Sequence, residues 1–431
     1  MTKLFTSSKY YLQQIAALLL YRSVLENEVG EKYLQLLQTL NLFSSETKSD
    51  RITAIECFEA YGTWFRALAK TNLSWQAYLS EQILLDDNPF SQQVQTTKLE
   101  DLTPALVAAA QHDLKILQNI YNFTGEKIAQ WVSSTSQTAD NLVVWQEKSE
   151  DPNLLQQTAD WQTAIPHLAQ HHRQNGTGIF ARHSAFRWQN GQLIGIAQPD
   201  PITLDRIVGY EHQKETLIQN TQFLLAGYQA LHILLYGSRG TGKSSLVKAL
   251  RTEYSSQGLR IVEVSKSELS NLPTIVEQLR QVPQKFIIFV DDLSFEEDDD
   301  AFKALKVVLE GNLTAAAPNI VVYATTNRRH LIREYFSDRP RPSDSDEIHN
   351  WDTVQEKLSF SDRFGLTITF EPADQTTYLQ IVQHLAQQAQ IEISQADLEF
   401  RAKQWATRGN GRSGRTAKQF VDYLRGEQGT R

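Results

Sequence analysis

Cysteine is almost absent from this sequence: Cys57 is the single one among 431 residues. One thiol excludes an internal disulfide, and we expect Cys57 to be a small buried hydrophobe in a reducing environment. Long apolar runs are missing as well. The longest run near the N-terminus, from Ile15 to Tyr21, is far shorter than the roughly 20 residues that cross a bilayer. We therefore expect a cytoplasmic protein with no membrane span and no signal peptide.

An excess of positive charge is also lacking, because 50 acidic residues outnumber 42 basic ones and give a net charge of −8. This balance argues against a protein that binds nucleic acid over its whole surface, although it is compatible with a local basic face. Histidines cluster between residues 167 and 183, but no nearby cysteine or carboxylate completes a set of zinc ligands. We therefore expect no zinc site there.

The chain is long enough for two or three domains, and its patterns divide it into four segments. Apolar residues recur at helical spacing over residues 1–170, which predicts a helical N-terminal domain that binds a partner or a substrate. Aromatic and β-branched residues flank Asn190-Gly191, which predicts a β-hairpin and linker over 171–200. Strands and helices alternate over 201–370, and the segment 371–431 is helical again.

Short apolar strands without polar alternation characterise the third segment. They are predicted at residues 232–236, 260–264, 286–290, 320–324 and 366–370. Buried strands that are joined by helices indicate a parallel sheet covered on both faces. The expected fold class is therefore α/β, with a parallel-sheet domain, a helical C-terminal lid and a mostly α-helical domain in front.

Glycines are concentrated in the turn that follows the first of these strands. The stretch Gly237-Ser238-Arg239-Gly240-Thr241-Gly242-Lys243-Ser244 fits G-x-x-x-x-G-K-[ST] and lies between a predicted strand and a predicted helix. Glycines allow positive φ, so consecutive backbone N–H groups can surround a phosphate at the positive end of the helix. We expect Lys243 to reach the β- and γ-phosphates and Ser244 to bind Mg²⁺. The sequence therefore predicts a site for a nucleoside triphosphate and Mg²⁺ that extends to Ser245.

Two carboxylates follow the apolar strand from Phe286 to Val290. A strand that ends in this way places Asp291 and Asp292 at the carboxyl edge of the sheet, beside the phosphate loop. We expect Asp291 to hold Mg²⁺ through water and Asp292 to polarise the water that attacks the nucleotide.

With these motifs in this order the sequence resembles a P-loop NTPase of the AAA+ ATPase family, and further stretches fit that family. Val208-Gly209-Tyr210 resembles the segment that lines the adenine pocket, and Asn327 resembles sensor 1, which orients the attacking water. Arg363 precedes the fifth strand, where the family has its arginine finger. Arg415 opens a lid helix and resembles sensor 2, which reaches the γ-phosphate, and Arg412 is the alternative residue for that role.

A narrower resemblance is to a bacterial family of ATP-binding proteins known as domain of unknown function 815, over roughly residues 175 to 428. It implies the same fold and an ATPase activity, and it implies no particular substrate. The stretches that carry it are Asp291-Asp-Leu-Ser-Phe-Glu-Glu, Thr325-Thr-Asn-Arg-Arg-His-Leu, Glu334-Tyr-Phe-Ser-Asp, Asp346-Glu-Ile-His and Glu356-Lys-Leu-Ser-Phe-Ser-Asp-Arg-Phe-Gly.

One position departs from the AAA+ pattern. Most AAA+ ATPases have Asp-Glu at the second motif, whereas this chain has Asp291-Asp292. Aspartate is one methylene shorter than glutamate, so its carboxylate has to approach the attacking water more closely, and geometry decides whether a general base can act. Either turnover is slow, which would make the protein a nucleotide-timed switch, or Glu296 or Glu297 helps Asp292. Of these two alternatives we expect slow but real hydrolysis.

The expected assembly and partners follow from the same resemblance. An arginine finger acts on the nucleotide of the next subunit, so Arg363 implies a homo-oligomer, either a ring or a dimer. The loop from Ser265 to Leu272 lacks the aromatic residue of protein-threading ATPases, which argues against an unfoldase. The acidic run from Glu296 to Asp300 would suit a basic polypeptide. Phosphates of a nucleic acid would instead suit the basic residues of the lid and the cluster of Arg328, Arg329 and Arg333.

Three functions are therefore open. The first is an ATPase that remodels or regulates an unknown protein partner, which it recruits through the N-terminal helices. The second is a helicase-loader-like ATPase that associates with nucleic acid. The third, a P-loop kinase for a small molecule, ranks last because it leaves Asn327, Arg363 and Arg415 unexplained in their order.

Overall fold

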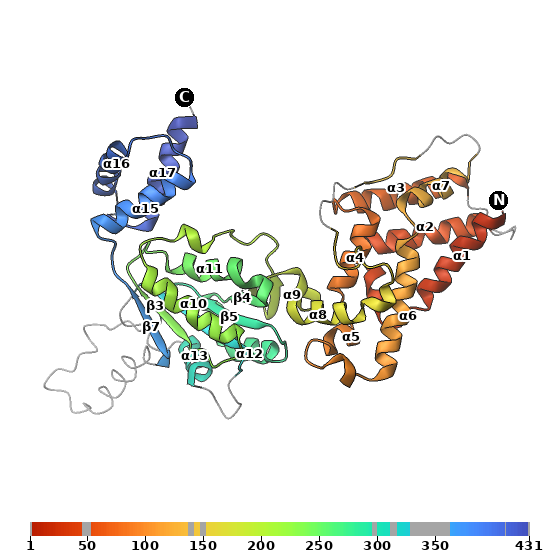
Figure 1. The fold of residues 1–431 in the computed structure, drawn as a ribbon, viewed down its shortest axis with the longest axis horizontal. Coiled ribbons are helices and arrows are strands. Elements are labelled where there is room, and N and C mark those ends of the chain that lie inside the picture. The colour runs from red at the N-terminus through yellow and green to blue at the C-terminus, as the bar shows by residue number, and fades with distance from the viewer. Residues whose placement is uncertain are drawn as a thin grey trace. The chain divides into compact units, whose positions relative to one another are not determined.

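A computed structural model describes residues 2–44, 53–136, 142–146, 152–294, 300–310, 317–327, 363–409 and 411–429. The chain divides into two compact units, Met1–Arg182 and His183–Arg431, and Figure 1 shows the elements of each. Within the described ranges, none of the helices combines the length and the apolar character that crossing a membrane requires.

The first unit is built from helices. Its α-helices are α1 (Thr2–Ala16), α2 (Glu28–Ser44), α3 (Ala54–Ala69), α4 (Trp75–Leu85), α5 (Pro89–Gln93), α6 (Pro104–Tyr121), α7 (Gly125–Ser133), α8 (Ile165–Asn175) and α9 (Gly178–Arg182). Short 3₁₀ helices lie at η1 (Tyr21–Leu25), η2 (Leu99–Asp101) and η3 (Trp161–Ala164). The helical stripes bury an aromatic core in which the Tyr33 and Trp75 rings stack with their centroids 4.3 Å apart.

A buried carboxylate organises the turn between α1 and α2. Asp113 of α6 is fully buried, and its two oxygens accept hydrogen bonds from the backbone N–H groups of Leu19, Leu20 and Tyr21 at 2.7–3.0 Å. These N–H groups lie at the start of η1 and in the two residues before it. The first N–H groups of a helix have no acceptor within the helix, so Asp113 supplies one. Asp113 therefore joins two segments that are far apart in the sequence.

The second unit contains one seven-stranded sheet. Its strands are β1 (Ala185–Gln189), β2 (Gln192–Gly195), β3 (Ile233–Gly237), β4 (Leu259–Glu263), β5 (Lys285–Val290), β6 (Ile320–Thr326) and β7 (Leu366–Phe370). They are arranged in the order β2-β1-β4-β5-β6-β3-β7, and every neighbouring pair except the β1–β2 hairpin is parallel. The predicted parallel sheet of an α/β domain is confirmed.

The hairpin is part of this sheet. Asn190 and Gly191 have φ values of 52° and 77° and form the two-residue turn that an Asn-Gly pair favours. Strand β1 pairs in parallel with β4, so the hairpin adds two strands to one edge of the sheet. The sequence predicted the turn but not this pairing, because a parallel pair joins segments that are distant in the chain.

Helices cover the sheet and form the lid. They are α10 (Glu211–Leu225), α11 (Lys243–Tyr254), α12 (Leu272–Arg280) and α13 (Asp300–Glu310), with η4 (Leu204–Arg206), η5 (Ser255–Gln257) and η6 (Lys266–Asn271). The lid consists of α15 (Gln375–Gln388), α16 (Gln395–Arg408) and α17 (Gly414–Gly429), and it has its own core around Tyr378 and Phe420. The predicted helical lid is therefore confirmed.

The position of the site follows from the sheet. Strands β5 and β6 are buried along almost their whole length, and β6 lies between β5 and β3. The carboxyl ends of these three parallel strands meet at one edge, where Asn327 lies between Asp291 and Gly237.

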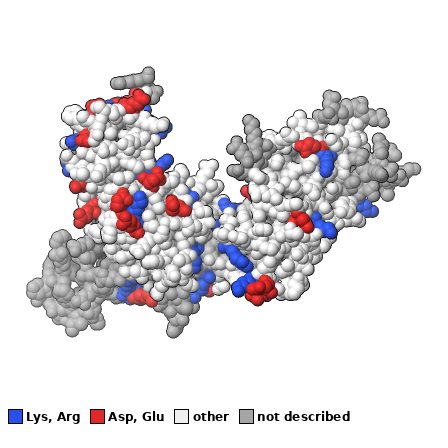
Figure 2. All heavy atoms as spheres, viewed as in Figure 1, with Lys and Arg blue, Asp and Glu red and all other residues white. Residues whose placement is uncertain are grey.

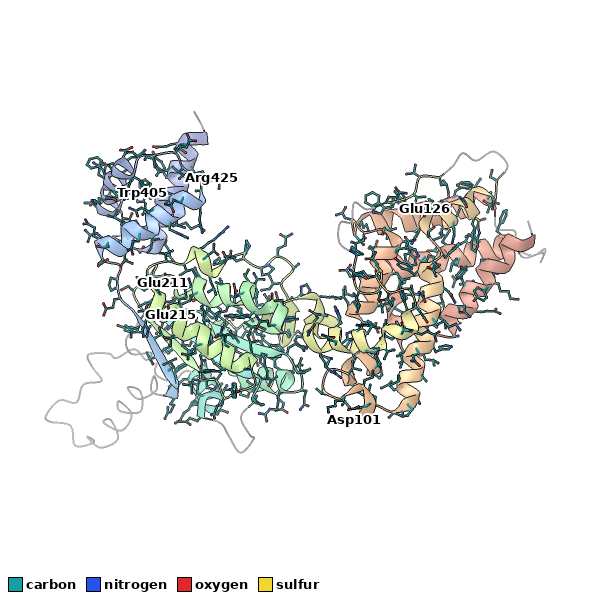
Figure 3. The ribbon with its side chains drawn as sticks, viewed as in Figure 1. Asp101, Glu126, Glu211, Glu215, Trp405 and Arg425 are labelled. Carbon is teal, nitrogen blue, oxygen red and sulfur yellow. The ribbon has the colours of Figure 1, made fainter. Side chains whose placement is uncertain are left out.

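We predict that Asp113→Ala lowers the free energy of unfolding of the first unit by about 3 kcal/mol, because three backbone donors lose their buried acceptor. Urea denaturation of the full chain, followed by tryptophan fluorescence, measures the change. Asp101→Ala is the matched control, since Asp101 is exposed in η2 (Figure 3) and its removal should change stability by no more than about 0.5 kcal/mol. Equal effects of the two substitutions would contradict the role of Asp113.

Candidate nucleotide-binding site

The phosphate loop connects β3 to α11. Gly237 ends the strand with φ 145°, and a Cβ atom there would lie 2.0 Å from the carbonyl oxygen of Phe370 on β7. Gly242 has φ 90° and is the residue before the first turn of α11. Glycine is needed at both positions, at the first for close packing and at the second for its backbone conformation. The loop therefore ends at the N-terminus of a helix, where partial positive charge gathers.

Lys243 lies at the centre of the loop and is only 6% exposed. Its ammonium group donates to the carbonyl oxygens of Gly237 and Ser238, both at 2.8 Å, and to Oδ1 of Asn327 at 3.1 Å. Burial lowers the pKa of Lys243, and the charges of Asp291 and Asp292 oppose this shift. Neutral acceptors hold the cation, so its charge is available to an anionic ligand in the loop.

Asp291 lies opposite the first turn of α11. Its Oδ1 accepts hydrogen bonds from the hydroxyl groups of Ser244 and Thr325, each at 2.6 Å. A carboxylate and a hydroxyl at this distance form an oxygen donor set of the kind that Mg²⁺ uses beside nucleotide phosphates. The chemistry of these residues therefore fits the metal ion that the sequence predicts.

Asp292 is held next to Asp291 in a different way. Its Oδ1 accepts a hydrogen bond from Nδ2 of Asn327 at 2.8 Å, and its backbone N–H donates to Oγ1 of Thr325 at 3.0 Å. The Asn327 amide thus binds Lys243 through its oxygen and Asp292 through its nitrogen. Asn327 connects the phosphate loop to the carboxylate that is predicted to polarise water.

A cavity of about 830 Å³ lies between the phosphate loop and the lid. Its polar end is formed by loop residues Arg239 to Ser245, together with Asp291, Asp292, Thr325 and Asn327. Its other walls come from the segment before α10 and from the lid helices. They are Asp200, Ile202, Arg206, Ile207, Val208 and Tyr210, then Ile381, Leu385 and Gln388 of α15 with Ala389 directly after it, and finally Gly414, Arg415, Lys418, Val421, Asp422 and Arg425 of α17.

The segment predicted to line an adenine pocket packs between the sheet and the lid. Val208 and Tyr210 line the cavity, and the Tyr210 hydroxyl donates to the carbonyl oxygen of Glu371 at 2.9 Å. Gly209 does not line the cavity. It has φ 92°, and a Cβ atom there would lie 2.6 Å from Cγ2 of Thr377. Gly209 therefore shapes the wall by letting the backbone approach α15 closely.

The lid reaches the phosphate loop through the start of α17. The backbone N–H of Arg415 donates to the carbonyl oxygen of Gly240 at 3.3 Å, and a Cβ atom on Gly240 would meet Oγ of Ser413 at 2.9 Å. Arg415 lines the cavity, whereas Arg412 donates to Oε1 of Gln375 at 3.2 Å and does not line it. Of the two arginines considered for sensor 2, Arg415 is the one that lines the cavity, and its contact with a γ-phosphate stays a prediction.

Arg363 does not line this cavity. Its Nε pairs with Oε1 of Glu310, the last residue of α13, at 2.5 Å. An arginine that acts on a neighbouring subunit is not expected in its own cavity, so the predicted arginine-finger role stays a prediction. Glu296, Glu297, Arg328, Arg329 and Arg333 lie outside the described residues, and so does most of the acidic run that ends at Asp300.

Several residues of the site were not predicted. Lys418, Asp422 and Arg425 lie on the same side of α17 as Arg415 and line the cavity, and Figure 3 labels Arg425. Their spacing of three, seven and ten positions from Arg415 is a helical signal that the sequence does contain. Thr325 carried no signal of its own, because a threonine in a strand is ordinary.

Solved structures of Thermotoga maritima RuvB are similar to part of the chain. The structure titled as the Holliday junction branch migration motor has 17% identity and a TM-score of 0.37, covering 52% of this chain and 63% of that one. A point variant of the same protein has 18% identity and a TM-score of 0.37, covering 52% and 64%. This chain therefore spans just under two thirds of those two chains. No curated protein matches the sequence.

The family comparison covers more than half of the chain. The model of a family described as a protein of unknown function, DUF815, matches residues 181–428. This range contains the whole sheet and the phosphate loop, together with the lid up to residue 428. The parallel sheet with the glycine-rich loop between β3 and α11 confirms the predicted P-loop fold. Such a fold supports nucleotide binding. The chain belongs to the DUF815 family.

Proposed function

We propose that this protein is an ATPase that binds ATP and Mg²⁺ between the phosphate loop and the lid and hydrolyses the nucleotide slowly. The hydrogen-bond network around Lys243 supports this most strongly. It joins the loop to Asn327, and through Asn327 to Asp292, with Asp291 beside Ser244. A cation for phosphates, oxygen ligands for a metal ion and a carboxylate for water therefore lie within one cavity.

In this proposal each residue has a distinct role. The backbone N–H groups of the loop and Lys243 bind the β- and γ-phosphates, and Arg415 approaches the γ-phosphate from the lid. Mg²⁺, held by Ser244 and Asp291, would neutralise charge on the phosphoryl oxygens. Asp292 accepts the proton of the attacking water, and Asn327 fixes the direction of that carboxylate. The apolar wall of Ile207, Val208 and Ile381 would receive the base.

The assignment of the segments is also a proposal. We infer that residues 201–370 bind the nucleotide, that 371–431 form a lid that senses it, and that 1–170 contact a protein partner. Residues 171–200 lie between these segments in the sequence, and their hairpin is part of the sheet. The protein would remodel or regulate that partner as a homo-oligomer in which Arg363 acts on the neighbouring site.

The helicase-loader-like alternative predicts that DNA stimulates hydrolysis. On the face shown in Figure 2, small groups of Lys and Arg and small groups of Asp and Glu are scattered over the described surface. Arg415, Lys418 and Arg425 line the nucleotide cavity, so in this proposal they contact ATP and are not available to a nucleic acid. Phosphate release with and without DNA, at two salt concentrations, distinguishes the two functions, because phosphate contacts weaken as salt rises.

Nucleotide binding should depend on Lys243. We expect Lys243→Ala to weaken ATP binding at least about tenfold, because the loop loses its buried cation. Titration calorimetry with ATP and Mg²⁺ measures the affinity. Lys248→Ala is the matched control, since Lys248 is on the same helix but does not line the cavity. ATP binding that is indifferent to the loss of Lys243 would overturn the assignment of the site.

The rate of ATP hydrolysis should depend on the carboxylate of Asp292. Asp292→Asn keeps the shape of the side chain and an oxygen that can accept from Asn327, but it removes the basic group. We expect phosphate release to fall about 10²-fold or more while ATP affinity is kept, since a general base contributes about 10²–10⁴-fold. Unchanged phosphate release would remove Asp292 from the mechanism.

If Arg363 acts on the nucleotide of a neighbouring subunit, two inactive variants should complement each other. We expect Arg363→Ala and Lys243→Ala to be inactive separately and partly active when mixed, because one variant supplies an intact loop and the other an arginine, which is worth about 10³–10⁵-fold in rate in known cases. Glu310→Gln is the control: it removes the ion pair of Arg363 and keeps the guanidinium. If Glu310→Gln is as inactive as Arg363→Ala, or the mixture gains nothing, Arg363 does not act on a neighbour.

A further inference from the structure

Asp292 has an unusual backbone conformation. Its φ is 52°, a value that L-amino acids other than asparagine and aspartate rarely adopt. Three other described non-glycine residues have positive φ. Asn190 lies in the hairpin turn, and Asn72 and Gln390 follow the ends of helices α3 and α15. Asp292 instead follows a buried strand and lies in the cavity. Backbone strain of this kind persists where the surroundings hold it in place, often at functional sites.

The group that holds it is the hydroxyl of Thr325. This side chain is on β6, which lies inside the sheet between β5 and β3, and the residue is 2% exposed. Its Oγ1 donates to Oδ1 of Asp291 at 2.6 Å and accepts from the backbone N–H of Asp292 at 3.0 Å. The backbone of Thr325 also takes part, because its carbonyl oxygen accepts from the N–H of Leu293 at 2.7 Å. Three consecutive residues after β5 are thus bonded to one residue of β6.

The hydroxyl is well suited to this double contact. It has a single hydrogen, which it gives to the Asp291 carboxylate, and a lone pair remains to accept from Asp292. Threonine is β-branched, so few χ1 rotamers are available to it and the direction of the hydroxyl is fixed by the strand. A hydrogen bond to an ionised carboxylate is also stronger than one between neutral groups.

We propose that Thr325 is a positioning residue that sets the geometry of both carboxylates, the one beside Ser244 and the one beside Asn327. This inference rests on the proposed ATPase function. Thr325 fixes Asp291 through its side chain and Asp292 through its backbone. The left-handed turn at Asp292 then brings the short aspartate side chain to the amide of Asn327, at 2.8 Å. In this proposal Thr325 takes no direct part in the reaction and acts through Asp291 and Asp292, to which its hydroxyl is hydrogen-bonded.

The same geometry explains why an aspartate can stand at position 292. A glutamate side chain would tolerate the positive φ less well, and its carboxylate would extend one methylene beyond the Asn327 amide. Lengthening the side chain should therefore not improve the enzyme. We expect Asp292→Glu to release phosphate more slowly than the unaltered protein, and a faster rate would show that the turn is not matched to aspartate.

The test uses two substitutions of Thr325 in the full chain. Thr325→Val keeps the shape and removes the hydroxyl, whereas Thr325→Ser keeps the hydroxyl and removes a methyl group. We expect Thr325→Val to lower kcat about 10-fold to 100-fold, as loss of a residue that orients a metal ligand does, with little change in KM for ATP. We expect Thr325→Ser to recover most of the lost rate.

A second readout is independent of turnover. Mn²⁺ replaces Mg²⁺ as the probe, and its binding to the protein with ADP is followed by electron paramagnetic resonance. The Mn²⁺ affinity should fall about 10-fold in Thr325→Val and return in Thr325→Ser. Thr221→Val is the matched control. Thr221 is fully buried in α10 and bonds the carbonyl of Leu217 and the hydroxyl of Tyr323, so its loss should lower the melting temperature and leave kcat and Mn²⁺ affinity unchanged.

The outcomes separate this inference from the proposed function. If the unaltered protein hydrolyses ATP and Thr325→Val matches it in kcat and Mn²⁺ affinity, the role of Thr325 is wrong and the ATPase stands. The role is also wrong if Thr325→Ser is as impaired as Thr325→Val, because the hydroxyl would then not matter. If the unaltered protein binds neither ATP nor Mn²⁺ with ADP, both the proposed function and this inference fail.

Discussion

The ammonium group of Lys243 is the charge on which the arrangement of the site depends. It is buried at the start of α11, where two loop carbonyls and Asn327 hold it. A buried cation with neutral partners is costly unless an anion completes its surroundings, and the loop presents its N–H groups at the same place. Asn327 passes this constraint to Asp292, and the sheet places Asp291 beside Ser244. The site is therefore one connected network, in which each polar group is oriented by the next.

The strand order is what allows such a network to form. Strand β6 lies between β3 and β5, so the residues at its carboxyl end are adjacent both to the phosphate loop and to the pair of carboxylates. Asn327 accepts a hydrogen bond from Lys243 on one side, and Thr325 donates one to Asp291 on the other side. The lid closes the cavity from the other side, with Arg415 bonded through its backbone to Gly240. The fold thus brings together residues that are separated by more than a hundred positions in the sequence.

Much of this could be predicted from the sequence, for reasons that are local. The glycines before Lys243 and the apolar strand before Asp291 specify a loop and a strand end by themselves, and both lie where the pattern placed them. The parallel pairing of β1 with β4 could not be predicted, since it depends on distant contacts. Thr325 could not be predicted either. A strand threonine has no distinguishing pattern until the register sets it opposite Asp291, and the positive φ of Asp292 appears only in the folded chain. Helical spacing places Lys418 and Arg425 on the same side of α17 as Arg415. Only the folded structure, in which α17 contacts the loop, shows that this side of the helix lines the cavity.

The most direct test of the account is to compare the affinities of the unaltered protein for ATP and for AMP in the presence of Mg²⁺, by titration calorimetry. The loop is proposed to bind the two outer phosphates, which AMP lacks, whereas both nucleotides offer the same base to the apolar wall. The account predicts that ATP binds at least about 100-fold more tightly than AMP, a difference that corresponds to about 2.7 kcal/mol. Equal affinities, or no binding of either nucleotide, would contradict the claim that Lys243 and its loop hold a triphosphate.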